Sequence, residues 1–108
     1  MSTLSTHVLD VERGLPAVGV PVALYRGQEH LGTHKTNIDG RIADVAGGPL
    51  SAGVYRITFD VAAYYHAQGR PAPFLQRVTI EFEAEATDRH YHVPLLLSPY
   101  ACTSYRGS

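Results

Sequence analysis

The sequence has a single cysteine, Cys102, no tryptophan, and a formal net charge of only −1. One cysteine excludes both an internal disulfide and a cysteine-rich metal centre. A nearly balanced charge offers no electrostatic footprint for nucleic acid or an anionic membrane surface, so we expect neither as a partner. No apolar run approaches the roughly 20 residues that a membrane-spanning helix needs. Residues 1–7 lack the basic and apolar regions of a signal peptide, and we therefore expect a cytoplasmic protein.

What is present is the composition of an ordinary globular domain. Hydrophobic residues make up 44% of the chain and charged residues 18%, which excludes a disordered protein. A chain of 108 residues can bury one hydrophobic core but not two. We therefore expect a single domain that spans residues 1–108.

Short alternating segments separated by turn residues predict a fold built mostly of strands. The segments are 3–11, 18–25, 30–36, 41–45, 53–59 and 74–83, followed by the run 90–108. Asn37-Ile38-Asp39-Gly40 predicts a turn that delivers Arg41 to the start of a strand. Segment 60–69 predicts one short helix, with Asp60 as N-cap and Gly69 as the stop. Seven or eight short strands and one brief helix indicate an all-β sandwich.

The C-terminal run 90–108 carries more polar chemistry than a fold requires. It predicts two strands joined by a turn at Ser98-Pro99, because proline fixes φ and has no N–H. If the turn is tight, His92 lies opposite Tyr105 on the same face of the sheet. The residues that this pairing gathers at one sheet end are His90, His92, Tyr105, Arg106 and Ser108. The pattern therefore predicts a functional site there.

The His90-x-His92 pair also leaves a metal site open as an alternative. Two histidines on one face of a strand are half of a possible zinc site. A third ligand would have to come from His7 or from an acidic residue that the pattern does not place. Because no second dense cluster of ligands exists, we expect no metal and treat a metal hydrolase as the weaker alternative.

Both ends of the chain resemble one known family. Residues 4–10, followed by Gly14-Leu15-Pro16-Ala17, resemble the N-terminal signature of the 5-hydroxyisourate hydrolases, the transthyretin-related enzymes of purine breakdown. The closing residues Tyr105-Arg106-Gly107-Ser108 resemble that family's C-terminal tetrapeptide, and Asp39-Gly40-Arg41 and residues 90–99 also match. The transthyretin hormone carriers share the fold but lack the closing tetrapeptide and the early histidine.

The resemblance implies a transthyretin-like β-sandwich of two four-stranded sheets with one short helix. It implies a homotetramer with active sites where two dimers meet. The implied reaction, a step of urate breakdown, is hydrolysis of 5-hydroxyisourate to 2-oxo-4-hydroxy-4-carboxy-5-ureidoimidazoline without metal or cofactor. By position, the implied catalytic residues are His7, Arg41, His92 and Ser108, and the implied substrate-binding residues are His7, Arg41 and Tyr105. Cys102 stands where we expect an aromatic residue in the last strand. This difference concerns the packing of the strand more than the chemistry of the site.

These residue types suit ring opening by water, which needs an activated nucleophile and stabilisation of the charge that develops on oxygen. Histidine titrates in the range that the first task requires, and arginine fits an anionic, carbonyl-rich substrate. Which histidine acts as the base stays open, as does the role of His90. We assign His30, His34 and His66 to ordinary polar faces.

Two other functions compete with hydrolysis. One is a binding module that carries a small aromatic ligand in a tetramer channel, and the other is a purely structural sandwich. A carrier predicts a mostly apolar channel. The combination of His7, Arg41, His92 and Ser108 favours the hydrolase.

Overall fold

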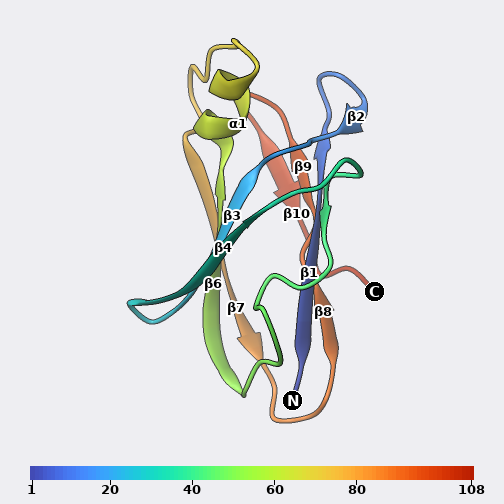
Figure 1. Cartoon of the computed structure of the whole chain (residues 1–108), viewed down its shortest axis with the longest axis vertical. Helices are drawn as coiled ribbons and strands as arrows, with labels where there is room; N and C mark the ends of the chain where they lie inside the picture. Colours follow the sequence, from blue (N-terminus) through green and yellow to red (C-terminus); the bar gives the residue numbers. More distant parts are fainter.

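Two β-sheets packed face to face and one short helix make up the protein (Figure 1), whose computed structural model describes all 108 residues. The elements run in the order β1 (Thr3–Asp10), β2 (Leu15–Pro16), β3 (Pro21–Arg26), β4 (Glu29–Lys35), β5 (Arg41–Ile42), β6 (Gly53–Asp60), α1 (Val61–Ala67), β7 (Arg77–Ala84), β8 (His90–His92), β9 (Leu95–Leu97) and β10 (Cys102–Ser104). The predicted all-β sandwich with one short helix is confirmed. The protein has no helix that is long and apolar enough to cross a membrane.

One sheet has the predicted four strands, and the other has six strand segments instead of four. The first runs β4-β3-β6-β7 and is antiparallel throughout. In the second, β8 and β9 both pair in parallel with β1, β10 pairs with β9, and β2 and β5 pair antiparallel with β1. The count rises from four to six for two reasons. β8 and β9 are one path interrupted at Val93-Pro94, where proline has no N–H for a ladder, and the two-residue β2 and β5 pair with successive parts of β1 as separate segments.

The core lies between the two sheets. Alternation along β1 turns Leu4 and Val8 inward, and both are fully buried, while Ser5 and His7 point to the outer face. β6 contributes Ile57 from the facing sheet. Full burial of one such aliphatic side chain contributes about 1.5–3 kcal/mol, so the inward set fixes the register of each strand. The same register fixes the positions of the outward-facing side chains of β1, Ser5 and His7, on the outer face of the sheet.

Helix α1 follows the prediction closely. The Asp60 side chain accepts a hydrogen bond from the backbone N–H of Ala63 at 3.0 Å, as an N-cap should. The helix ends at Ala67, and Gly69 has a φ of +69° in the left-handed region. The predicted helix over 60–69 is thus confirmed within two residues at its end.

A buried carboxylate ties the segment after α1 to the end of β1. Asp10 is fully buried and accepts hydrogen bonds from Arg70 Nη2 at 2.6 Å and from the Tyr64 hydroxyl at 2.7 Å. Burial alone would raise the pKa of the Asp10 carboxyl, but these two donors and the Arg13 N–H outweigh it and lower that pKa. The charge pair therefore holds together two parts of the chain that are far apart in sequence.

The predicted register of the C-terminal hairpin is wrong by two residues. Leu97 pairs with Cys102, because residues 98–101 form a longer loop than the predicted tight turn, and in this loop Ser98 and Ala101 are hydrogen-bonded to each other. His92 consequently bridges to Gly107 and not to Tyr105. Loop length sets hairpin register, and the sequence pattern alone did not give the loop length.

Candidate active site

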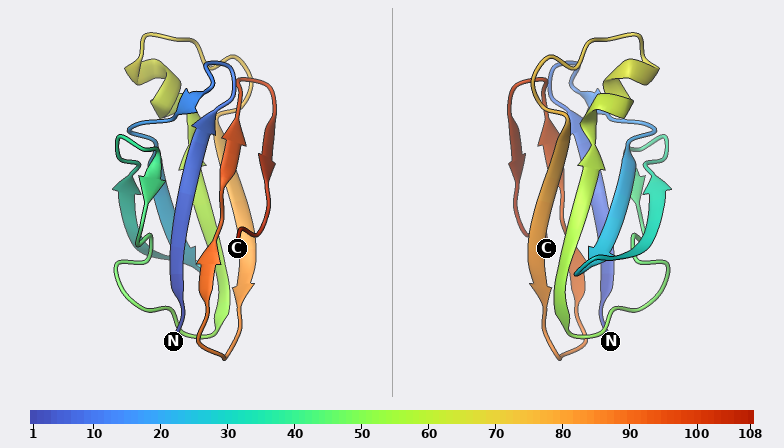
Figure 2. Two further views of the ribbon diagram at one scale, coloured as in Figure 1. Left: turned by 90° about the vertical axis from the view of Figure 1, so that its right-hand side faces the viewer. Right: turned by 90° about the vertical axis from the view of Figure 1, so that its left-hand side faces the viewer.

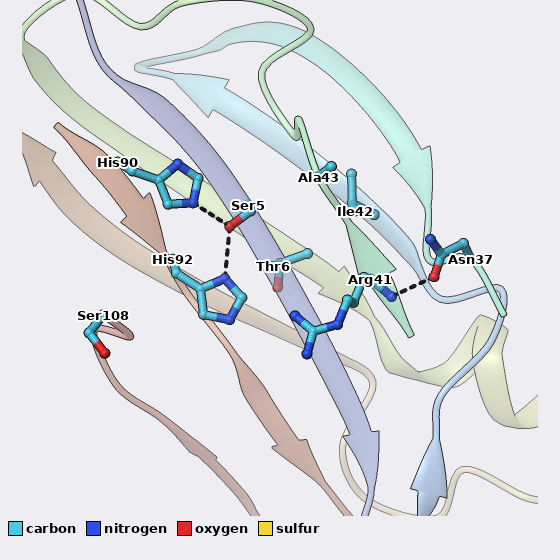
Figure 3. A pocket seen from close by; sticks show the side chains of 9 residues that line it. All are labelled: Ser5, Thr6, Asn37, Arg41, Ile42, Ala43, His90, His92 and Ser108. Carbon is cyan, nitrogen blue, oxygen red and sulfur yellow. Dashed lines mark hydrogen bonds between the residues drawn. The ribbon is translucent and has the colours of Figure 1, made fainter. Parts of the chain in front are cut away.

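A polar cavity of about 470 Å³ opens on the outer face of the sheet that contains β1 (Figure 3). Three of the four predicted catalytic residues line it. Its lining comprises Ser5, Thr6, Asn37, Arg41, Ile42, Ala43, His90, His92 and Ser108. Residues from both ends of the chain and from its middle thus meet at one place.

The parallel pairing of β1 with β8 positions the two histidines. Thr3 pairs with His90 and Ser5 pairs with His92, while the intervening Tyr91 is buried in the core. Successive side chains of a strand alternate between faces, so His90 and His92 share the outer face with Ser5. The predicted common face for the two histidines is therefore confirmed.

Arg41 is placed by a tight turn. The Asn37 side-chain oxygen accepts hydrogen bonds from the N–H groups of Asp39 at 2.9 Å and Arg41 at 3.0 Å. Gly40 has a φ of +72°, and a Cβ there would lie 2.5 Å from the Val8 carbonyl oxygen. The turn predicted at 37–40 is confirmed, and its glycine is required by both conformation and space.

Arg41 then pairs with His7 on β1. His7 is half-buried on the outer face of the strand and does not itself line the cavity. It is nevertheless close enough to His92 to influence its protonation, as described below. The structure thus brings His7, Arg41 and His92 into one neighbourhood.

Close backbone packing brings Ser108 to the cavity. The Gly107 N–H donates to the His92 carbonyl oxygen at 2.7 Å. A Cβ at Gly107 would lie 2.5 Å from Cδ2 of His92, so a larger residue would displace the imidazole. The closing tetrapeptide therefore requires a glycine at this position, because its backbone packs directly against the His92 ring.

His92 is in an environment that favours its neutral form. Burial lowers the pKa of His92 below the ordinary 6.5, and the charge of Arg41 and the neighbouring His7 and His90 lower it further. Its Nδ1 lies 2.8 Å from Ser5 Oγ, and its other ring nitrogen is turned toward the Arg41 side chain (Figure 3). A neutral imidazole beside a permanent cation can accept a proton from water at neutral pH.

Tyr105 lies apart from the other predicted site residues. It is 58% exposed and lines a second, largely apolar cavity of about 250 Å³ with Ile80, Phe82 and Tyr91. Arg106 stacks over the Tyr91 ring at 5.1 Å on that same side. The prediction that one sheet end gathers Tyr105 and Arg106 with His92 is therefore wrong within the single chain, because β10 ends at Ser104 and the alternation of a strand does not extend to these two residues.

Sequence reasoning missed Ser5 and Asn37 as lining residues and left His90 open. Period-two alternation from His7 would have placed Ser5 on the same outer face. His30, His34 and His66 lie outside the cavity, as predicted, and Cys102 is exposed elsewhere. The structure places no group of three or more His, Cys, Asp or Glu side chains that could hold a metal ion with His90 and His92.

Comparison with known proteins identifies the family of the chain. The family model of the HIUase/Transthyretin family matches residues 4–107. The 5-hydroxyisourate hydrolase of Caulobacter vibrioides is 44% identical over the full length of both chains, and that of Mesorhizobium japonicum is 48% identical over 97% of this chain and 91% of the relative.

Solved structures agree with this. The 5-hydroxyisourate hydrolase of Klebsiella pneumoniae matches the whole of both chains at 44% identity and a TM-score of 0.91. The transthyretin of Sparus aurata matches 97% of this chain and 96% of its own at 31% identity and a TM-score of 0.88. These matches confirm the transthyretin-like fold, and the chain belongs to the HIUase/Transthyretin family.

Proposed function

We propose that this protein hydrolyses 5-hydroxyisourate to 2-oxo-4-hydroxy-4-carboxy-5-ureidoimidazoline as a step of urate breakdown. Eight relatives that carry the name 5-hydroxyisourate hydrolase are 40–48% identical to it. The observation that carries the proposal is the polar cavity that His92 and Arg41 line together, where burial and the Arg41 charge lower the pKa of His92. A carrier of apolar ligands is expected to have a mostly apolar pocket, without a histidine and an arginine side by side.

In the proposed mechanism, His92 takes a proton from water as the water oxygen attacks a ring carbonyl carbon. Arg41 holds the carbonyl oxygen on which negative charge develops. The C–N bond of the ring then breaks, and the proton held by His92 goes to the departing nitrogen, so that the imidazole is regenerated. No metal or cofactor takes part in these steps.

The remaining predicted site residues have supporting roles in this proposal. His7 lies beside Arg41 and binds the substrate with it. Ser108 lines the cavity, where its hydroxyl can hold the water or a substrate oxygen. Tyr105 binds substrate only across an interface, because within one chain it lines the other cavity.

The proposed assembly is a homotetramer with its active sites at the interface between dimers, in the cytoplasm. Two features support association. The strands β7 and β10 each have a partner on one side only, and both lie on the same side of the sandwich (Figure 2). Free strand edges are templates for pairing with another chain. The cavity is also open on the outer face of its sheet, where a facing copy can enclose it.

The first test is the absorbance decay of 5-hydroxyisourate, generated in place from urate by urate oxidase, with and without the protein. We expect accelerated decay that a chelator does not affect, and loss of most of this acceleration in His92→Ala. Acceleration abolished by the chelator would instead support the zinc alternative at His90 and His92. A folded protein with no acceleration would refute the hydrolase and favour a carrier, such as the thyroxine-bound sea bream transthyretin that it resembles at 32% identity and a TM-score of 0.88.

A further inference from the structure

The hydroxyl of Ser5 lies between two histidines. Ser5 Oγ is 2.8 Å from Nδ1 of His92 and 2.8 Å from Nε2 of His90 (Figure 3). Nδ1 of His90 is in turn 2.6 Å from Thr3 Oγ1. The parallel register of β1 and β8 thus creates one hydrogen-bonded row of side chains, which leads from the half-buried His92 to the exposed His90 along the cavity lining.

The single proton of a hydroxyl restricts how this row can be arranged. With both rings neutral, one arrangement has His92 donating from Nδ1 to Ser5 and Ser5 donating to Nε2 of His90. The other arrangement reverses both hydrogen bonds. Of these two arrangements, in which the hydroxyl donates to one of the rings, only the first leaves Nε2 of His92 with a free lone pair on the Arg41 side of the cavity, because the partner of one ring nitrogen sets the state of the other.

We propose that Ser5 is a positioning residue that holds the proton of neutral His92 on Nδ1 and connects this ring to His90 as a proton relay. The inference rests on the proposed hydrolysis. When Nε2 of His92 accepts a proton from water, Nδ1 releases its own proton to Ser5 Oγ. The Ser5 hydroxyl proton moves at the same time to Nε2 of His90. The positive charge then resides on His90, and His92 is neutral again.

The charges around His92 favour this transfer. Arg41 on β5, His7 on β1 and His90 on β8 all face it, and the ring itself is partly buried. A protonated His92 would be a second positive charge beside Arg41, and both repulsion and burial raise the free energy of that state. His90 is exposed, so solvent can stabilise the charge there until the proton is returned. The relay reverses as Nε2 passes its proton to the departing nitrogen, so that Nδ1 regains its proton and no imidazolate is left.

The test combines kinetics with ¹⁵N NMR of the imidazole nitrogens of His92, at a pH where the ring is neutral. In the wild-type protein we expect the proton on Nδ1. In Ser5→Ala we expect a mixture of the two tautomers. We also expect kcat to fall about tenfold to 100-fold, the range found when outer partners that orient metal-binding histidines are removed, with KM changed less than about threefold. Ser5→Thr keeps the hydroxyl and should restore the tautomer and most of kcat.

Ser51→Ala is the matched control. Its hydroxyl also bridges two polar side chains, lying 2.6 Å from Arg26 Nη1 and 3.3 Å from the Tyr55 hydroxyl, but it lies outside the cavity. It should leave kcat and the His92 tautomer unchanged. An active wild-type enzyme whose Ser5→Ala variant keeps both its kcat and the Nδ1 tautomer would overturn the inference alone. A wild-type protein without hydrolase activity would overturn the proposed function and the relay with it, even if Ser5 controls the tautomer.

Discussion

At the scale of single residues, the protonation of His92 depends on its burial and on the charges of its neighbours. Replacement of Arg41 by Gln removes a positive charge that faces the ring, so we expect the pKa of His92 to rise toward 6.5 from below. Site-specific NMR titration measures this directly. Arg56→Gln is the control, because Arg56 packs over Tyr25 on the other sheet and should not affect His92. An unchanged pKa in Arg41→Gln would contradict the electrostatic account.

The sign of the pH effect follows from the same shift. His92 acts as a base only when neutral, so the proposed activity should fall as pH decreases through a pKa that lies below 6.5. The folded state also resists protonation more than the unfolded state does. The contribution of this group to stability is therefore complete above pH 6.5 and is lost as pH falls through the lowered pKa.

Residue identity is also where sequence reasoning was strongest. The residue types and the family resemblance placed Arg41, His92 and Ser108 at one site, and all three line the cavity. Ser5 escaped notice because serine is common on strand surfaces and gains meaning only from the two imidazoles beside it. Those partners are more than 80 positions away along the chain, where no local pattern can show them.

At the scale of elements, the turn before β5 controls where Arg41 lies. Gly40→Ala places a Cβ against the Val8 carbonyl oxygen in a backbone conformation that non-glycine residues disfavour. We expect a loss of about 2 kcal/mol or more in the free energy of unfolding, measured by denaturant titration, together with loss of turnover.

Gly14→Ala is the matched control for that turn. Gly14 has a similar φ of +69°, but a Cβ there would meet nothing within 4 Å. The Gly14→Ala variant should lose only the conformational strain of a positive φ, about 1 kcal/mol of the free energy of unfolding, and keep its turnover. Equal effects of the two variants would show that close packing at Gly40 is unimportant.

Elements were predicted well where local chemistry decides them, and less well where distant pairing does. Asp60 and Gly69 mark the helix in the sequence itself. The strand predicted over 41–45 shortens to Arg41–Ile42, because the Asp44 side chain binds the N–H groups of Gly47 and Gly48 and turns the chain away. The hairpin register failed for a similar reason, since a serine side chain extended the loop.

At the scale of the whole molecule, the proposed tetramer predicts what happens to the free edges of the sandwich. We expect light scattering to give a mass of about four times 11.8 kDa. We expect slow hydrogen exchange at the edges of β7 and β10, because a partner chain would cover amides that lack one here. A monomeric mass with rapid exchange along both edges would refute the assembly. That result would also remove the proposed substrate-binding role of Tyr105.

The position of β1 within its sheet has a consequence for synthesis. This strand is made first, yet β8 and β9, which pair with it along one edge, are made near the end of synthesis, and Thr3 pairs with a residue 87 positions later. Such distant pairing slows folding, since a long loop must close before any contact is gained. On the ribosome, the first strand therefore remains without these neighbours until nearly the whole chain has emerged. The cavity therefore cannot be completed until His90, His92 and the final Ser108 have been synthesised.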